Sequence, residues 1–171
     1  MALRTAISYT NEREQFNQKL SNFHLTQEKL ADMAIRIFAS EAIQYRTGGL
    51  LEGKLGALVT TDDTQANSKA LSEHAIECAI CKVFSSETLD QVVDESLQLH
   101  GGYGFMKDYA VENMYRDSRI NRIFEGTNEI NRFLIPSFLM KKAELLGPFV
   151  RDAFESFGET IRLSQILYPI K

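Results

Sequence analysis

The amino-acid sequence predicts an all-α protein, an antiparallel helical bundle of about four main helices joined by shorter ones. Apolar residues recur at intervals of three and four over several long segments, as they do on the buried face of an amphipathic helix. No segment has the alternation of apolar and polar residues that indicates a half-buried strand. The chain has 171 residues, 44% of them hydrophobic, which is enough for one sizeable core.

The first half of the chain contains two predicted helices. One is expected from Ala2 to about Arg13, and a connection over residues 16–24 separates it from a long second helix. The glycines at 48–49 weaken that helix towards its end, and residues 53–65 have the composition of a linker. The apolar stripe of the second helix, which we expect to face the core, contains Leu30, Met33, Ala34, Ile37 and Phe38.

The second half begins with two predicted helical segments. A helix should begin at residues 64–66, after a run of N-cap residues, and the serines at 85–86 favour a break. Thr88 and Gln91 have the spacing of a capping box for the next segment, which should end at the paired glycines 101–102.

The last predicted helices lie beyond these glycines. A short helix is expected over residues 109–120 and another over residues 128–146, which Pro136 should kink or shorten. The helical bundle is therefore assigned to residues 1–146. Residues 147–171 are expected to start a C-terminal extension with one further helix.

Charge and composition exclude several classes of function. Nineteen Lys and Arg against twenty-three Asp and Glu give a net charge of −4, and no basic run indicates nucleic-acid binding. No apolar stretch approaches the roughly 20 residues that cross a bilayer, so no integral membrane segment is expected. The N-terminus lacks the layout of a signal peptide and opens inside a helical pattern without an N-cap residue. These features predict an intracellular protein, located in a bacterial cytoplasm or in the mitochondrial matrix, and we prefer the bacterial cytoplasm. The opening inside a helical pattern suggests that the chain is a piece of a longer protein.

Cys78 and Cys81 have a spacing that allows a redox or metal pair. No second cysteine pair or nearby histidine pair would complete a zinc site, so no metal is expected. Both cysteines lie among apolar residues of a predicted helix, which favours a structural role in the core. His74 and His100 are interpreted as packing or surface residues.

Two motifs within residues 98–132 carry chemical information. At Gly101 and Gly102 a helix ends in paired glycines, which fits either a plain C-cap or a close approach of the backbone to another molecule. Glu125 follows two large apolar residues and precedes a glycine and an N-cap residue. This pattern fits either a solvated loop carboxylate or a general base on a tight loop beside apolar surface, because apolar surroundings make a carboxylate more basic.

Taken together, these motifs resemble those of the acyl-CoA dehydrogenase family. The C-terminal domain of that family contains a Q-x-x-G-G motif, matched here by residues 98–102, then R-D at 116–117 and E-G-T at 125–127. Upstream, residues 13–16 are similar to the family's R-x-x-F motif, and residues 27–33 are similar to the start of its following helix.

The resemblance covers residues 2–145 and is strongest for the very-long-chain members, through residues 22–30 and 122–128. Asn17 and His24 depart from the family pattern, in which many members have glycine and glutamine at these positions.

The resemblance implies α,β-dehydrogenation of a long-chain acyl-CoA thioester, a step of fatty-acid β-oxidation, with FAD as the cofactor. Glu125 would take the α-proton while the β-hydrogen leaves as hydride to the flavin. The backbone N–H of Glu125 would donate a hydrogen bond to the thioester carbonyl. Electron-transfer flavoprotein is the implied electron acceptor. Because other domains of the family hold most of the flavin and substrate, this chain is expected to be inactive alone.

The resemblance also assigns the flavin contacts. Two positions, Thr127 and Glu129, match residues that face the subunit's own flavin. A second set matches residues that reach the FAD of a neighbouring subunit, which implies a homodimer or homotetramer. That set contains Arg13, Phe16, Gln98 and Gly102.

Other interpretations stay open. An acyl-CoA oxidase shares this fold and lets oxygen reach the reduced flavin, and a helical interaction module could keep the bundle for binding alone. A group of arginines fits either CoA phosphates or, as we prefer, charge pairs with neighbouring helices. The group contains Arg116, Arg119, Arg122 and Arg132.

Overall fold

The computed structural model describes residues 1–56 and 64–146, and α-helices account for most of them. The helices are α1 (Ala2–Glu12), α2 (His24–Leu55), α3 (Thr64–Glu73), α4 (Ala75–His100), α5 (Ala110–Ser118) and α6 (Asn128–Leu146). The short 3-10 helices are η1 (Leu20–Asn22), η2 (Gly101–Phe105) and η3 (Arg119–Arg122), and the strands are β1 (Glu14–Gln15) and β2 (Gln18–Lys19). The predicted all-α class is confirmed.

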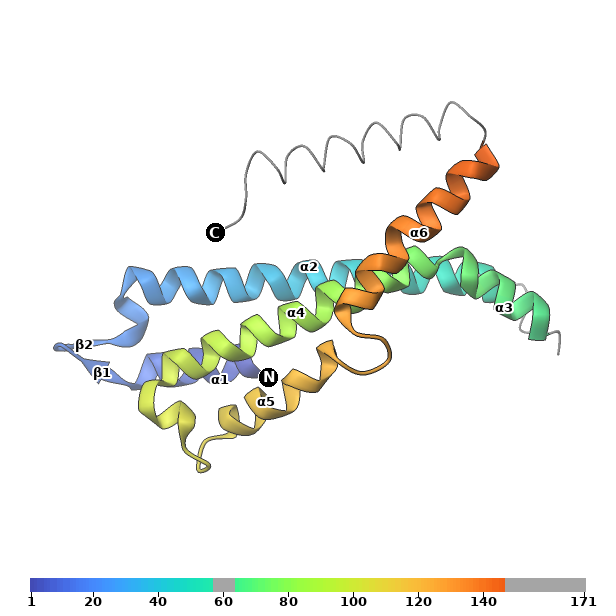
Figure 1. Cartoon of the computed structure of the whole chain (residues 1–171). Helices are drawn as coiled ribbons and strands as arrows, with labels where there is room; N and C mark the ends of the chain where they lie inside the picture. Colours follow the sequence, from blue (N-terminus) through green and yellow to red (C-terminus); the bar gives the residue numbers. More distant parts are fainter. Residues whose placement is uncertain (57–63, 147–171) are drawn as a thin grey trace, which may run out of the picture.

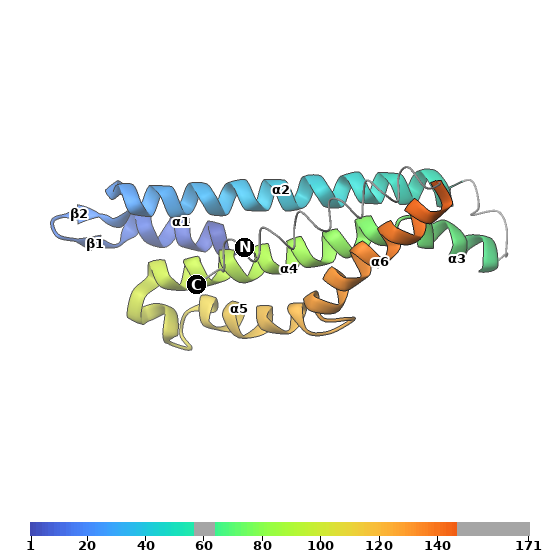
Figure 2. The same ribbon diagram turned by 45° about the horizontal axis from the view of Figure 1, so that its top comes forward.

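Helix α4 lies at the centre of the bundle and contacts α1, α2, α5 and α6. In Figures 1 and 2, α2 and α5 lie on opposite sides of α4, and α6 crosses it. The paired strands extend past the end of α1 as a small hairpin. A helix with neighbours around it must be apolar on more than one face, which explains why α4 carries more buried residues than any other described helix.

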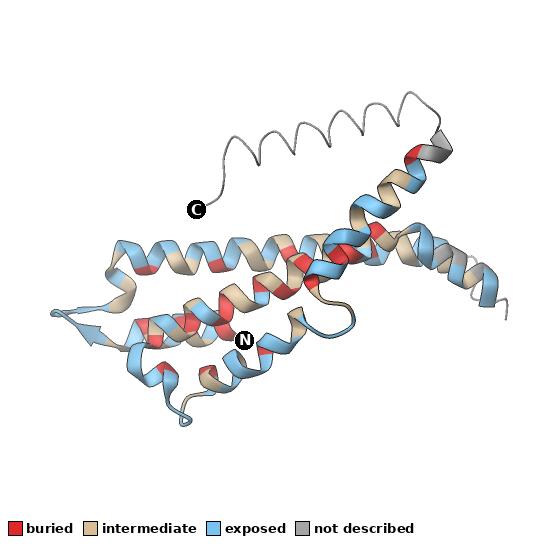
Figure 3. Ribbon diagram, viewed as in Figure 1, coloured by how far each residue is buried: buried red, intermediate tan, exposed pale blue. Residues whose placement is uncertain are grey.

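The core lies where α1, α2 and α4 meet, and the buried residues concentrate along α1 and α4 in Figure 3. Met33 of α2 is 1% exposed and Val93 of α4 is 2% exposed. A polar contact also joins α4 to α1, because Ser96 Oγ of α4 donates to the Ala2 carbonyl of α1 at 3.1 Å. The other members of the core cluster are Ala2, Ala6 and Val92, with Leu3, Leu30, Ile37, Leu99 and Met114 packed against them.

The break predicted at Ser85 and Ser86 is wrong, because α4 continues through both serines and the interruption falls at His74 instead. Ser86 is satisfied inside the helix: its Oγ donates to the Val83 carbonyl at 3.1 Å. The predicted capping box fails for the same reason, since Thr88 is a buried residue in the middle of α4. The predicted end of α4 before the paired glycines is confirmed, with φ of +59° at Gly101.

The apolar stripe predicted for α2 is only partly buried. Leu30, Met33 and Ile37 pack into the core as expected, but Ala34 is exposed and Phe38 is 73% exposed. The buried face instead continues through two small polar residues, which fit close to α4: Ser40 and Thr47. Helix–helix contacts tolerate such hydroxyls because they can bond to polar groups nearby, as Ser40 Oγ does to Ser85 Oγ at 2.9 Å.

Helix ends also differ from expectation. Helix α2 continues to Leu55, into the predicted linker, and α3 begins at Thr64 as predicted. Pro136 does not shorten α6, which ends at Leu146. The proline is exposed, so water can reach the carbonyl that loses its helical partner. The predicted C-terminal extension lies outside the described residues.

Candidate active site

Glu125 lies in a tight turn between η3 and α6. Its φ is +52° and that of Gly126 is +84°, so two successive residues have left-handed backbone. A Cβ on Gly126 would lie 3.2 Å from Asn131 Nδ2, in a conformation that already disfavours a side chain. A left-handed glutamate costs about 1–3 kcal/mol, and such strain is concentrated at functional sites. The predicted tight loop is therefore confirmed.

The Glu125 side chain is exposed, and its carboxylate has no hydrogen bond or ion pair with any described residue. Its backbone N–H is likewise without a partner in the described part of the chain. The burial expected for this carboxylate is thus not provided by the described residues. What the turn does provide is a free acceptor and a free donor on the same residue.

Side chains from α4 and α6 hold this turn in place. Asn131 Nδ2 donates to the carbonyls of Gly126 and Thr127, at 3.0 and 3.1 Å. Lys82 Nζ donates to the Gly126 carbonyl at 2.8 Å. Thr127 Oγ accepts from the Ile130 N–H at 3.3 Å and so caps the start of α6, as predicted.

Asn128 connects the turn to α4. It is 2% exposed, and its Oδ1 accepts from Lys82 Nζ at 2.6 Å. Its Nδ2 donates to Ser86 Oγ at 2.9 Å and to Glu87 Oε1 at 3.1 Å. Glu87 also forms a two-pronged ion pair with Arg132, at 2.6 and 2.8 Å, and this contact lowers the pKa of Glu87, helped by the bond from Asn128. The hydrogen-bonded network fastens α6 to α4 beside Glu125.

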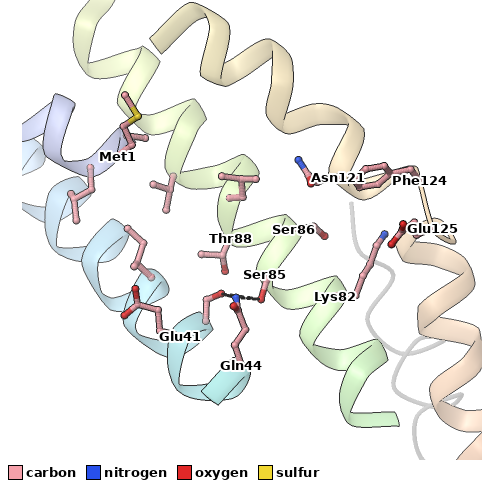
Figure 4. Close-up of a pocket in the computed structure, with 16 residues that line it drawn as sticks. Met1, Glu41, Gln44, Lys82, Ser85, Ser86, Thr88, Asn121, Phe124 and Glu125 are labelled. Carbon is pink, nitrogen blue, oxygen red and sulfur yellow. Dashed lines mark hydrogen bonds between the residues drawn. The ribbon is translucent and has the colours of Figure 1, made fainter. Parts of the chain in front are cut away.

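A cavity of about 560 Å³ opens beside Glu125, between α1, α2, α4 and the turn. In Figure 4, Lys82 extends towards the segment that carries Phe124 and Glu125, while Glu41 and Gln44 of α2 lie on the opposite wall. The wall is mixed in character, with apolar side chains from Ile37, Leu89 and Val92 and hydroxyls from Ser40, Ser85 and Thr88.

A second cavity, of about 520 Å³, brings together Arg13, Gln98 and Gly102. Gln98 is exposed, and nothing lies within 4 Å of the position that a Cβ would take on Gly102, so its backbone is open. The Arg13 guanidinium lies over the Tyr103 ring, 5.5 Å from its centre. A charged fork, an amide and an open backbone together suit an anionic group such as a phosphate.

The hairpin beside this cavity carries Phe16 at its tip. Phe16 and Asn17 have φ of +53° and +63°, which is the backbone of a two-residue type I′ turn between β1 and β2. Asparagine tolerates a left-handed backbone better than most residues, which explains why Asn17 can replace the glycine that many members of the family have at this position. Phe16 is 88% exposed, so the strained turn holds a large aromatic side chain away from the bundle.

Thr127 and Glu129 lie on a third, small hollow of about 90 Å³, together with Arg119 and Arg122. The pKa of Glu129 is lowered, first by a hydrogen bond from its own backbone N–H and then by the Thr127 hydroxyl. Its negative charge also lies in the first turn of α6, where the helix dipole favours it.

Comparison with known proteins assigns the family. The profile of the family described as "Acyl-CoA dehydrogenase, C-terminal domain" matches residues 1–140. The chain belongs to the acyl-CoA dehydrogenase family. A probable acyl-CoA dehydrogenase of Bacillus subtilis (strain 168) is 54% identical over 138 residues, covering 80% of this chain and 23% of that protein.

Two further relatives support this assignment. The very long-chain specific acyl-CoA dehydrogenase of Macaca fascicularis is 40% identical over 157 residues, or 90% of this chain and 22% of that protein. The crystal structure of an acyl-CoA dehydrogenase from Bacillus anthracis, complexed with FAD, matches with a TM-score of 0.80 and 51% identity. That match covers 84% of this chain and 25% of the solved chain. The chain thus spans about a quarter of the length of these relatives.

The residues assigned from the acyl-CoA dehydrogenase motifs separate into distinct places. Glu125 borders the larger cavity, three of the residues expected to reach a neighbouring subunit surround the second, and two others border the small hollow. Phe16 lines none of these cavities but projects from the adjacent hairpin. Whether these places correspond to a neighbouring subunit's flavin and the subunit's own flavin stays a prediction.

Most of the arginine group pairs with acidic side chains of the bundle. Arg122 lies 3.2 Å from Asp90 of α4, and Arg116 lies 2.5 Å from Glu112 one turn earlier in α5. With the Arg132–Glu87 pair, these contacts support the structural interpretation over phosphate binding.

The remaining titratable candidates have structural positions. His100 is 3% exposed and stacks on Tyr9, with ring centres 4.2 Å apart, as a packing residue. Cys81 Sγ donates to Thr47 Oγ at 3.1 Å, but Cys78 is exposed, so the expected core position is wrong for that cysteine. Among the described residues there is neither a cluster able to hold a metal nor a helix long and apolar enough to cross a membrane.

Sequence reasoning did not find Lys82, Asn128 or Asn131. Asn128 and Asn131 follow the E-G-T motif within one helical turn, so their closeness to it was a usable signal. Lys82 lies 44 residues from Gly126, and nothing in the spacing of the sequence connects the two.

Proposed function

We propose that this chain is the part of a flavin-dependent acyl-CoA dehydrogenase that supplies the catalytic base and one edge of the flavin site. The observation that carries the proposal is the Glu125 turn. A strained left-handed backbone presents an unpaired carboxylate at the edge of a cavity, within the E-G-T motif of the family. The proposed reaction is α,β-dehydrogenation of a long-chain acyl-CoA thioester in fatty-acid β-oxidation.

The chemistry asked of Glu125 matches what the turn offers. Its carboxylate would accept the α-proton of the thioester, and its free backbone N–H would donate to the thioester carbonyl and so acidify that proton. FAD, when bound, would accept the β-hydrogen as hydride. The substrate would exclude water from the turn, which strengthens both interactions.

The residues around the second cavity fit FAD, the cofactor that the acyl-CoA dehydrogenase family requires. Arg13 and Gln98 are donors suited to a pyrophosphate, and Gly102 leaves room for close approach. Phe16 on its hairpin would contact the flavin nucleotide of a neighbouring subunit. Thr127 and Glu129 would face the subunit's own flavin.

We therefore propose a homodimer or homotetramer, with electron-transfer flavoprotein as electron acceptor. The likeness to a very long-chain specific relative supports a long acyl chain. Because the match covers only 23% of the Bacillus subtilis relative, we expect the 171-residue chain to need the other domains of such enzymes for activity.

Replacing Arg13 with alanine in the complete enzyme should weaken FAD retention and subunit association together. Loss of a charge-assisted bond to phosphate is expected to cost about 1.5–3 kcal/mol. The measurements are the flavin-to-protein absorbance ratio after dilution and the dimer dissociation constant by analytical ultracentrifugation. Arg46→Ala, on the exposed surface of α2, is the matched control. Unchanged values of both quantities in Arg13→Ala would show that Arg13 does not cross to a neighbouring flavin.

A further inference from the structure

Lys82 has an unusual environment for a lysine. It is half-buried in α4, and among the described residues its ammonium forms no ion pair. It donates instead to two neutral oxygens, the Gly126 carbonyl at 2.8 Å and Asn128 Oδ1 at 2.6 Å. Lysines usually keep the ammonium in water, so a partly buried one directed at carbonyl oxygens indicates a specific task.

The two oxygens lie on either side of Thr127, so the ammonium bridges the turn that carries Glu125. The Gly126 carbonyl also accepts from Asn131, but Asn131 belongs to α6, the helix that the turn leads into. Of its two donors, Lys82 is the one that comes from α4, which forms a wall of the cavity. The bond therefore fixes the turn relative to the cavity and not merely relative to its own helix.

The backbone at this point needs such a restraint. Gly126 is at φ of +84°, and glycine has more backbone freedom than any other residue. A hydrogen bond to the Gly126 carbonyl holds the peptide unit between Gly126 and Thr127 in place. It therefore limits rotation about the ψ angle of Gly126. Figure 4 shows Lys82 extending from α4 towards the segment that carries Glu125. This restraint on the residue that follows Glu125 comes from a side chain 44 positions away from Gly126 in the sequence.

We propose that Lys82 is a positioning residue for Glu125, which holds the carboxylate in the direction needed for proton transfer. The proposal rests on the proposed function of Glu125 as the base. Proton abstraction needs the carboxylate within hydrogen-bond reach of the substrate carbon acid, and a misplacement of about 1 Å can cost about a hundredfold in rate. Lys82 would not touch the substrate itself.

The first arm of the test uses the 171-residue chain in solution. The variants are Lys82→Met, which keeps the length of the side chain without its donors, and Lys82→Arg, which restores charge and donors. Lys142→Met is the matched control. Lys142 Nζ also donates to a backbone carbonyl, that of Glu73, at 2.9 Å, but Lys142 lies near the C-terminal end of α6, whereas the turn precedes the start of that helix. The readouts are the amide NMR signals and relaxation of residues 125–127, with circular dichroism to monitor folding.

In this arm, Lys82→Met should shift and broaden the signals of residues 125–127, while Lys82→Arg and Lys142→Met should leave them near their original positions. Should Lys82→Met lose its helical signal, Lys82→Gln takes its place. Its uncharged amide is polar enough for this site but lies one bond closer to the backbone than the lysine ammonium, so the same shift and broadening are expected. Unchanged signals in a folded Lys82→Met chain would overturn the proposal.

The second arm uses the complete flavoenzyme under anaerobic conditions and follows flavin bleaching on mixing with acyl-CoA. Lys82→Met should lower the limiting rate by about 10–100-fold and change the dissociation constant of acyl-CoA by less than about threefold. Lys82→Arg should recover most of the rate. A fall in affinity as large as the fall in rate would assign Lys82 to substrate binding and overturn the positioning role.

The two proposals can fail separately. If Glu125→Gln bleaches its flavin at the original rate, the proposed function is wrong. If Glu125→Gln is slow while Lys82→Met keeps both its rate and its NMR signals, Lys82 has no positioning role and the proposed function stands.

Discussion

Replacing Glu125 with glutamine in the complete flavoenzyme is expected to slow flavin reduction by about 10²–10⁴-fold, the usual contribution of a general base. Glutamine keeps the size and the hydrogen-bonding shape of the side chain but cannot accept the α-proton. The variant should still fold, retain FAD and bind acyl-CoA, because no described residue depends on the Glu125 carboxylate for a hydrogen bond or ion pair. Anaerobic stopped-flow absorbance measures the rate.

A matched control separates this effect from a general change of charge. Glu28 is an exposed glutamate of α2 outside all three cavities, and Glu28→Gln should bleach its flavin at the original rate. Bleaching of Glu125→Gln at a similar rate would mean that the base lies elsewhere in the enzyme. The left-handed turn would then need another explanation.

Local signals in the sequence were enough to place most of the helices. Paired glycines predicted the end of α4, because a residue at φ of +59° favours glycine. Turn-forming and N-cap residues predicted the start of α3 at Thr64, and the helix beginning at Asn128 follows its cap as expected. In each case the residues that predict a helix end lie within one or two helical turns of that end.

Expectations failed where a distant partner decides the outcome. Serines at 85–86 favour a helix break when considered alone, but Ser86 bonds to Asn128 of α6 and stays helical. Phe38 fits an apolar stripe, yet the contact with α4 selects the face that contains Met33 and Ser40. Periodicity gives the faces of a helix but not which of two adjacent apolar faces a neighbour covers.

The same division applies to the candidate site. The tight loop at Glu125 was predictable because the motif and the glycine are contiguous in sequence. The contact of Lys82 with the turn was not predictable, since it forms only where α4 and α6 cross. Tyr103 under the Arg13 guanidinium is a similar case, joining η2 to the end of α1.

Asn128 is expected to be the residue of this site with the greatest effect on stability. It is almost fully buried, and its amide group satisfies Lys82, Ser86 and Glu87 at once. Replacing it with alanine leaves a half-buried ammonium short of one acceptor and opens a small cavity. Each buried polar group left without a partner costs about 1–3 kcal/mol, so we expect Asn128→Ala to lower the free energy of unfolding by about 3 kcal/mol.

Urea unfolding of the 171-residue chain, followed by circular dichroism, measures this loss. Asn113→Ala is the control: Asn113 is an exposed asparagine of α5, and its replacement should change the free energy of unfolding by less than about 0.5 kcal/mol. A loss below about 1 kcal/mol in Asn128→Ala would mean that apolar contacts alone dock α6 on α4. A loss of about 3 kcal/mol in Asn128→Ala would mean that the polar network beside Glu125 stabilises the fold as well as the turn. The stability of the whole bundle would then maintain the strained backbone of the candidate base.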